Sequence, residues 1–246
     1  MRYLVVSDIH ANWEALDAVL TRAAGRYDAI VCCGDLIGYG PDPNRVIDWA
    51  RQNLHSVIRG NHDRACCGLD DLEWFNPIAQ AASRWTMAEL TESNLNWLRA
   101  LPQGPLIVNG FLLAHGSPLD EDEYVISLSD AANIFSYLES SLTFFGHTHL
   151  QGGFAWLNGS RHAIARPDPD EPAVSLRIDP DGAYLVNPGS VGQPRDGDAR
   201  AAYALYNAET RQVLLERAPY DFVAVRLKIE ADGLPPGLGS RLGFGR

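Results

Sequence analysis

Hydrophobic residues over the first sixty positions form short runs separated by amphipathic segments. The runs are rich in Val, Ile and Leu, which is typical of buried strands, and they cover residues 2–7, 28–35 and 55–61. Between them, residues 11–25 and 44–52 carry apolar side chains at helical spacing, and the first of these segments ends at Gly25. This β-α-β-α-β order predicts parallel strands joined by right-handed crossovers.

The pattern changes further along the chain. Residues 106–116 predict a hairpin that turns at Asn109-Gly110, and residues 142–146 predict another strand. Further helices are predicted at 77–90, 92–100 and 129–139. Later short strands predict a second, more antiparallel sheet, at 153–157, 173–178, 184–186, 201–206 and 212–216. Residues 158–172 predict a surface loop, and the tail from Gly233 is expected to be loosely held.

Composition limits the class of protein. The chain has 246 residues, 46% of them hydrophobic, which is enough for one well-filled core, so we expect a single domain over residues 1–246. No apolar run approaches membrane-spanning length, and the first ten residues do not resemble a signal peptide. We therefore expect a soluble cytoplasmic protein. A homo-oligomer is compatible with the sequence but cannot be deduced from it.

The net charge of −11 repels polyanions, so no nucleic-acid partner is expected.

The cysteines form two adjacent pairs, Cys32-Cys33 and Cys66-Cys67, without the spacing of a metal site. We interpret them as reduced, packed thiols; a redox or ligand role for Cys66 or Cys67 is the alternative. The aromatic residues of 74–86 are expected to pack in a core rather than line a base pocket. We expect His55 at a strand edge and His162 in a loop, both without a function.

Each predicted strand of the α/β part is followed by residues that commonly bind metal ions. These residues are Asp8, His10, Asp35, Asn61, His62, His115, His147 and His149. The carboxyl ends of parallel strands meet at one edge of a sheet, so we expect these side chains to converge there. Oxygen and imidazole donors without thiolates suit two divalent ions of borderline hardness. Any one of these motifs could instead be a turn or a helix cap; the repetition at five strand ends favours a site.

Several glycines stand next to these residues, and we expect them to let the backbone turn sharply at the strand ends without a side-chain clash. They are Gly34, Gly60, Gly116 and Gly146.

The ordered motifs resemble those of the calcineurin-like metallophosphoesterases. The motifs are "SDIH" (7–10), "CGDLIGYGP" (33–41), "RGNHD" (59–63), "AHG" (114–116) and "GHTH" (146–149). With "NPGSVGQPRDG" (187–197), the chain is most similar to the small bacterial and archaeal phosphoesterases. The resemblance implies an α/β fold, a four-layer α-β-β-α sandwich of two mixed sheets flanked by helices, with a metal site at the strand carboxyl ends.

The resemblance also implies how two divalent ions (Mn, Fe, Zn, Co or Ni) are held. Asp8, His10 and His149 would bind one ion, Asn61, His115 and His147 the other, and Asp35 would bridge them. A hydroxide bridging the ions would then attack phosphorus in line, in a phosphomonoester, a phosphodiester or a dinucleoside polyphosphate.

By the same resemblance, His62 would protonate the leaving group. Protein phosphatases of the superfamily orient this histidine with an aspartate where this chain has Gly38, so the partner of His62 is unidentified. Ala11 replaces a glycine that is common in the family, and we expect the helix start to tolerate it because alanine is a good helix former.

Residues Asn12, Tyr39, Ser190 and Arg195 are candidates for phosphate binding, with a turn residue or a surface charge as the alternative for each. Ser190 lies in a glycine-rich stretch whose N–H groups could form an anion nest. Three other functional hypotheses stay open: a nuclease of the superfamily, a metal-binding scaffold of the same fold that engages a protein partner, and a dinuclear peptidase. The acidic charge disfavours the first, and the presence of all seven ligand residues disfavours the second. The third does not explain Asn61.

Overall fold

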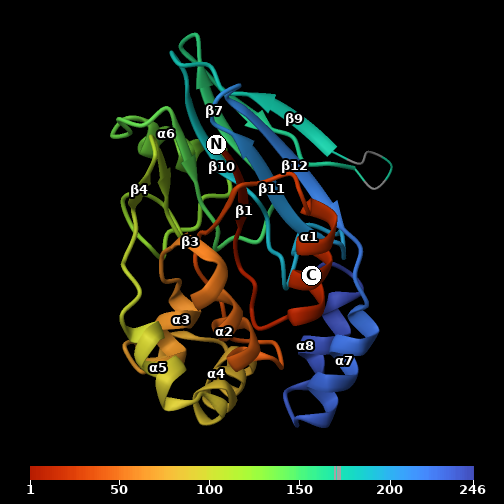
Figure 1. Cartoon of the computed structure of the whole chain (residues 1–246). Coiled ribbons are helices and arrows are strands. Elements are labelled where there is room, and N and C mark those ends of the chain that lie inside the picture. Colours follow the sequence, from red (N-terminus) through yellow and green to blue (C-terminus); the bar gives the residue numbers. More distant parts are fainter. Residues whose placement is uncertain (169, 171–172) are drawn as a thin grey trace.

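Two mixed sheets form the centre of the protein, as seen in a computed structural model that describes residues 1–168, 170 and 173–246 (Figure 1). Within these residues, the first sheet has the order β3-β2-β1-β11-β12-β9. Its strands are β1 (Arg2–Val6), β2 (Ala29–Cys32), β3 (Leu54–Val57), β9 (Ala173–Arg177), β11 (Ala201–Asn207) and β12 (Gln212–Ala218). Strands β1, β2 and β3 are parallel, and the remaining pairs are antiparallel.

The second sheet has the order β4-β5-β6-β10-β7-β8. Its strands are β4 (Leu106–Val108), β5 (Phe111–Leu113), β6 (Leu142–Phe144), β7 (Gly152–Leu157), β8 (Ser160–Ile164) and β10 (Ala183–Asn187). The β4–β5 hairpin turns at Asn109 and Gly110, as predicted, with φ of 45° and 93°. Two consecutive residues with positive φ are typical of the tight turns that match strand twist.

The helices flank these sheets. They are α1 (Trp13–Ala23), α2 (Pro43–Asn53), α3 (Asn61–Cys66), α4 (Pro77–Glu89), α5 (Glu92–Arg99), α6 (Leu128–Phe135), α7 (Phe222–Ala231) and α8 (Pro236–Leu242), with a 3-10 turn, η1, at Leu72–Trp74. Asn12 caps α1 by accepting a hydrogen bond from the Ala15 N–H, and Ser127 caps α6 through the Asp130 N–H.

Three apolar layers hold the sandwich together. One packs β1 and β2 against α1 and α2, through residues such as Leu4 and Leu16. The middle layer fills the space between the two sheets and includes Tyr3, Phe111 and Phe144, whose rings meet edge to face or stacked with Tyr206. The outer layer packs α6 onto the second sheet. The predicted four-layer α-β-β-α arrangement is therefore confirmed.

Some predicted elements need correction. The strands after residue 150 do not form one sheet of their own: β9, β11 and β12 extend the first sheet, whereas β7 and β10 join β5 and β6. The predicted loop 158–172 contains β8, which pairs with β7 and carries His162 opposite Ala155; residues 169, 171 and 172 of that range lie outside the described residues. His55 lies exposed on the edge strand β3, as expected.

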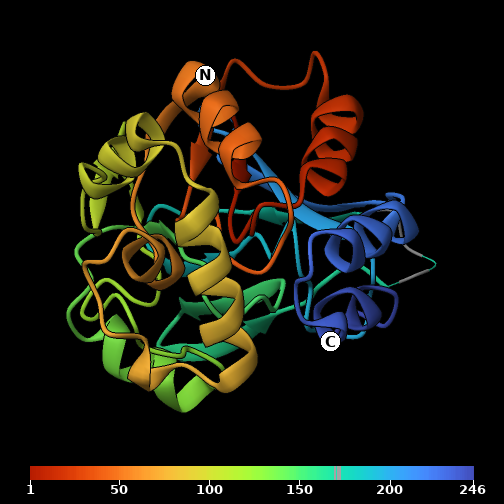
Figure 2. The ribbon, with the colours of Figure 1, turned by 90° about the horizontal axis from the view of Figure 1, so that it is seen from below.

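The C-terminal segment is folded where a loosely held tail was expected. Leu238 and Leu242 of α8 are buried against α7 and α4, in a cluster with Tyr39. Figure 2 shows α7 and α8 beside α4 at this end of the molecule. Helices α3, α7 and α8 were not predicted from the sequence.

The four cysteines are free and buried, as interpreted from the sequence. Burial raises the pKa of the Cys66 thiol, which keeps it protonated and unreactive. Among the described residues, no helix is both long and apolar enough to cross a membrane.

Candidate metal centre

The polar residues that follow the strands converge at one end of the sheets. Asp8 and His10 follow β1, Asp35 follows β2, and His115 follows β5. His147 and His149 follow β6, and Asn61 is the first residue of α3. Asp8, His10, Asp35, His147 and His149 all have φ between 49° and 65°, a left-handed conformation that costs free energy in residues other than glycine. Such strain concentrates where the surrounding structure fixes functional side chains.

One group of donors consists of Asp8, His10, Asp35 and His149. They are buried, and their potential ligand atoms lie within 4.8 Å of one another. His10 Nε2 is 3.0 Å from His149 Nε2, and His149 Nε2 is 3.3 Å from Asp8 Oδ1. Two imidazoles and two carboxylates at this spacing match the donor set of a borderline divalent ion.

A second group lies on the other side of Asp35. Asn61 Oδ1 is 3.1 Å from His115 Nε2 and 3.0 Å from His147 Nδ1. His115 Nε2 is also 3.5 Å from Asp35 Oδ2. These three side chains come from different elements, and the fold brings them together as the sequence analysis expected.

Asp35 connects the two groups through a single oxygen. Its Oδ1 accepts a hydrogen bond of 2.9 Å from the His62 N–H. Its Oδ2 is buried, has no hydrogen-bond partner among the described residues, and lies 3.6 Å from His10 Nε2. A buried carboxylate oxygen without a partner is costly, and cations on both sides of it would remove that cost. The residues present therefore fit two divalent ions that share Asp35.

Backbone carbonyls orient three of the imidazoles. His10 Nδ1 donates to Ile37 O at 3.0 Å, His115 Nδ1 to Cys33 O at 2.9 Å and His149 Nδ1 to Gln193 O at 2.6 Å. Because Nδ1 donates to the backbone, the Nε2 atom of each ring points into the site, which is the arrangement that metal-binding histidines use.

Burial and charge shift the pKa values of these groups. Burial lowers the pKa of His10 and of His149 well below the usual range, which favours the neutral rings that bind cations. Burial alone would lower the pKa of His115 too, but the Asp35 carboxylate outweighs it and raises this pKa to about 10. A cation bound between Asp35 and His115 would compete directly with that proton.

Asp63 supports the site and was not identified from the sequence. Its carboxylate accepts hydrogen bonds from the N–H groups of Gly60, Leu36 and Ile37, so it ties α3 to the loop after β2. Burial, together with the nearby charge of Asp35, raises the pKa of Asp63 to about 7. Its position at the third residue of α3, typical of a capping box, was the available signal.

The glycines next to the site serve two purposes. Gly34 has φ of 101°, so it makes the sharp turn that was expected. Gly60, Gly116 and Gly146 have no positive φ, so the expected left-handed turn is absent there, but a Cβ at each would collide with neighbouring atoms, as the expectation of an avoided side-chain clash requires. A Cβ at Gly60 would lie 2.1 Å from Asp35 Oδ1, so this position needs glycine because the two segments approach too closely for a side chain.

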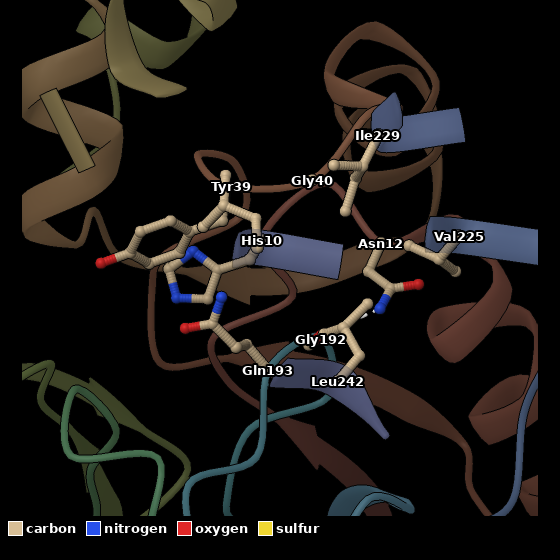
Figure 3. A pocket seen from close by; sticks show the side chains of 10 residues that line it. His10, Asn12, Tyr39, Gly40, Gly192, Gln193, Val225, Ile229 and Leu242 are labelled. Atoms are coloured by element: carbon tan, nitrogen blue, oxygen red, sulfur yellow. Dashed lines mark hydrogen bonds between the residues drawn. The ribbon is translucent and has the colours of Figure 1, made fainter. Parts of the chain in front are cut away.

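Asn12 and Ser190 lie under the site instead of facing a ligand. The Asn12 side chain caps α1 and donates from Nδ2 to Gly192 O at 2.8 Å, beside a cavity of about 10 Å³ that Val225 and Ile229 of α7 also line (Figure 3). Ser190 is fully buried; its hydroxyl donates to the Asp8 carbonyl and accepts from the Gln193 N–H. Both predicted phosphate contacts are therefore better explained as supports of the site loops.

The glycine-rich stretch around Ser190 is not an anion nest. The Val191 N–H donates to Ser7 O and the Gly192 N–H to Asp8 O, so these groups hold the loop after β1 in place.

Tyr39 and Arg195, the other two candidates, do lie at the site. Arg195 Nη2 is 3.5 Å from the Tyr39 hydroxyl, and the Arg195 guanidinium lies 5.8 Å from the centre of the Tyr39 ring. Arg195 Nε is buried without a hydrogen-bond partner in the described part of the chain. A guanidinium with a free donor next to a cluster of histidines and carboxylates can accept an anion.

His62 is held by aromatic rings. The Tyr39 ring lies 4.3 Å from it, the Phe75 ring 5.0 Å and the His10 ring 5.0 Å, between centroids. Its Nδ1 is buried, has no partner among the described residues, and faces Gly38, where a Cβ would lie 2.7 Å away. The missing aspartate is thus replaced by aromatic packing. Burial lowers the pKa of His62 to about 4, outweighing the opposing effect of Asp35.

The expectation for residues 74–86 is correct only in part. Trp85 packs against the α4, α7 and α8 cluster, but Phe75 contacts His62, and Trp74 is 89% exposed. Tyr124, which the sequence analysis did not single out, lies 4.1 Å from the His147 ring. Their aromatic character was visible in the sequence; the positions of Trp74 and Phe75 depend on η1, which was not predicted.

Comparison with known proteins agrees with this geometry. A sequence model of the calcineurin-like phosphoesterase superfamily domain matches residues 1–211. The chain belongs to this superfamily. Its candidate metal cluster lies at the strand carboxyl ends, where the superfamily resemblance implied it.

Relatives extend over the whole chain. An uncharacterised protein of Methanocaldococcus jannaschii is 34% identical over 251 residues, which cover 98% of this chain and 97% of that protein. The crystal structure of a metallophosphoesterase from Sphaerobacter thermophilus is 37% identical and superimposes with a TM-score of 0.85, covering 100% of this chain and 99% of that one. A hypothetical protein of Pyrococcus horikoshii shares the fold at 20% identity, with a TM-score of 0.78 and coverage of 100% and 98%.

Proposed function

We propose that this protein is a dinuclear metal-dependent phosphoesterase that hydrolyses a small phosphate ester. The supporting observation is the unpartnered, buried Oδ2 of Asp35 between two sets of nitrogen and oxygen donors. Asp8, His10 and His149 would hold one ion, and Asn61, His115 and His147 the other. Imidazole and carboxylate donors suit Mn, Fe, Zn, Co or Ni. Such ions supply Lewis acidity toward phosphate oxygens and toward water.

The protein's own groups would bind and orient the ester. Arg195 would bind a phosphate oxygen through its free Nε donor, and the Tyr39 ring would hold both Arg195 and His62 in place. His62 would donate a proton to the leaving oxygen. A bound phosphate raises the pKa of this imidazole, because a nearby negative charge favours its protonated form.

A scaffold without catalysis is the competing function. A scaffold does not require all seven donors, a His62 at the edge of the same cluster, or strained backbone at five of the donors. Phosphomonoesters, phosphodiesters and dinucleoside polyphosphates are the substrate classes to compare.

His62→Ala tests the proposed chemistry. After reconstitution with Mn²⁺, we expect turnover to fall by ~10²–10⁴-fold while the metal content is unchanged, because His62 supplies a proton and no metal bond. The loss should be largest for alkyl leaving groups, since aryl oxides depart without a proton.

The matched control is His55→Ala, which changes an exposed histidine on β3. Turnover should be measured on aryl phosphomonoesters, aryl phosphodiesters, cyclic nucleotides and dinucleoside polyphosphates. Unchanged turnover of His62→Ala on all of them would remove His62 from the mechanism.

A further inference from the structure

An open pocket adjoins the metal centre on the side of His62. Its volume is about 460 Å³, and Asn61, His62 and His147 form its inner end. This volume lies within the range of small-molecule sites. A group bound there would be next to a phosphate held at the centre.

Aromatic side chains line the walls of this pocket. Tyr39 and Phe75 are packed against His62, whereas Trp74 is 89% exposed and Tyr124 is 53% exposed. An indole left this open to water loses the free energy that burial would provide, and a ligand ring that covered it would recover that free energy. The pocket therefore favours a planar, aromatic ligand group.

The charges around the pocket exclude a second phosphate. Arg64 is the basic residue of the pocket wall, and it already forms ion pairs with Asp70 at 2.8 Å and Asp122 at 2.7 Å. Arg64 also pairs with Glu121, which Arg59 binds at 2.9 Å. The carboxylates outnumber the guanidinium groups, so the wall repels anions and accepts hydrogen bonds from hydroxyl or amino groups.

We propose that this pocket binds the nucleoside of a substrate that carries a single phosphoryl group, with the base packed among Trp74, Phe75 and Tyr124. The assignment rests on the proposed function and specifies its substrate class. A nucleoside offers an aromatic base and neutral hydrogen-bond donors, which correspond to the two kinds of wall.

The position of His62 makes this nucleoside the leaving group. Since Nδ1 of His62 is buried against Gly38, the other ring nitrogen is the one that can face the pocket. Hydrolysis breaks the bond between phosphorus and the nucleoside oxygen and forms a bond between phosphorus and a water oxygen. The nucleoside oxygen takes up a proton, and the phosphoryl product keeps the water oxygen.

Binding measurements on the Mn²⁺-loaded protein distinguish the affinity contributed by the phosphate from that contributed by the nucleoside. Calorimetric titrations should compare inorganic phosphate, ribose 5-phosphate and adenosine 5′-monophosphate. We expect Trp74→Ala to weaken binding of the nucleotide by roughly 5- to 150-fold, the range for stacking on one aromatic side chain, and to leave the two other affinities unchanged. Because Trp74 is exposed, its truncation leaves the core intact.

Tyr137→Ala is the matched control, since Tyr137 is also exposed, at 68%, but does not line this pocket. Its nucleotide affinity should equal that of the wild type. If phosphate binds but the nucleotide binds no more tightly than ribose 5-phosphate, or if Trp74→Ala binds it normally, the nucleoside assignment is wrong. It is also wrong if phenyl phosphate binds as tightly as the nucleotide. Failure of phosphate itself to bind would instead overturn the proposed function, and this assignment with it.

Discussion

At residue 60 there is no space for any side chain. Gly60 has φ of −107° and ψ of 179°, which every residue can adopt, so the constraint is contact and not conformation. Its neighbour in that contact is Asp35, whose Oδ1 also accepts the His62 N–H. One glycine thus fixes the position of the Asp35 carboxylate relative to the proposed proton donor, His62.

Gly60→Ala should displace Asp35. We expect loss of metal and of turnover, together with a decrease of about 1–3 kcal/mol in the free energy of unfolding, as for other overpacked sites. Metal analysis and urea denaturation measure the two effects. Gly237→Ala is the control, because the nearest atom to a Cβ there is 3.8 Å away. Full metal content in Gly60→Ala would contradict the assigned role of this contact.

At the residue scale, the candidate metal ligands could be identified from the sequence, but the residues that hold those ligands in place could not. Asp and His at strand ends carry a visible chemical signal, whereas Ser190 and Asn12 differ from ligand-facing residues only in where their hydrogen bonds go. Ala11 shows the same limit. Ala11 precedes α1 and has φ of 52°, which is not a helical conformation. Helix propensity, the reason expected for tolerating alanine here, therefore does not apply.

At the scale of elements, a buried ion pair connects β12 to the loop that carries Arg195. Arg217 is 1% exposed and pairs with Asp196; its Nε also donates to Gln151 Oε1 at 2.7 Å. Gln151 in turn donates to the carbonyls of Pro188, Tyr203 and Glu216. This network fixes the loop under the candidate metal centre to both sheets.

Arg217→Met should destabilise the protein by about 3–5 kcal/mol, because the Asp196 carboxylate would be left buried without its partner. The double variant Arg217→Met/Asp196→Asn should recover part of the loss, since the unpaired charge is gone. Chemical denaturation of the three proteins measures both values. A single variant as stable as the wild type would show that this pair does not hold the loop.

Element prediction succeeded where the pattern was local. The amphipathic spacing of α1 and α2 and the Asn109-Gly110 turn are properties of short segments, and the structure has them. Helix α3 has six residues and depends on Asp63, and α8 is held by contacts with α4 and α7. The assignment of β9, β11 and β12 to the first sheet depends on pairing partners far away in the chain, which no local pattern specifies.

At the scale of the whole molecule, both sheets contribute donors to one centre. β1 and β2 of the first sheet deliver Asp8, His10 and Asp35, and β5 and β6 of the second deliver His115, His147 and His149. The sequence predicted this convergence from repeated strand ends, because the order of parallel strands places their carboxyl ends together. In a chain with a net charge of −11, cations bound at this centre would also supply the local positive charge that the proposed anionic substrate requires.

Two divalent ions, one in each donor group, are proposed to share the Asp35 carboxylate. The variant Asp35→Asn tests this central claim most directly. The substitution preserves shape, and the amide oxygen can still accept the His62 N–H. Wild-type protein that has been stripped with a chelator and reloaded with Mn²⁺ should contain about two ions per chain by elemental analysis and regain turnover. Asp35→Asn should lose metal and turnover together. An Asp35→Asn variant that retains both ions, or a wild-type protein whose turnover does not respond to the chelator, would contradict the claim.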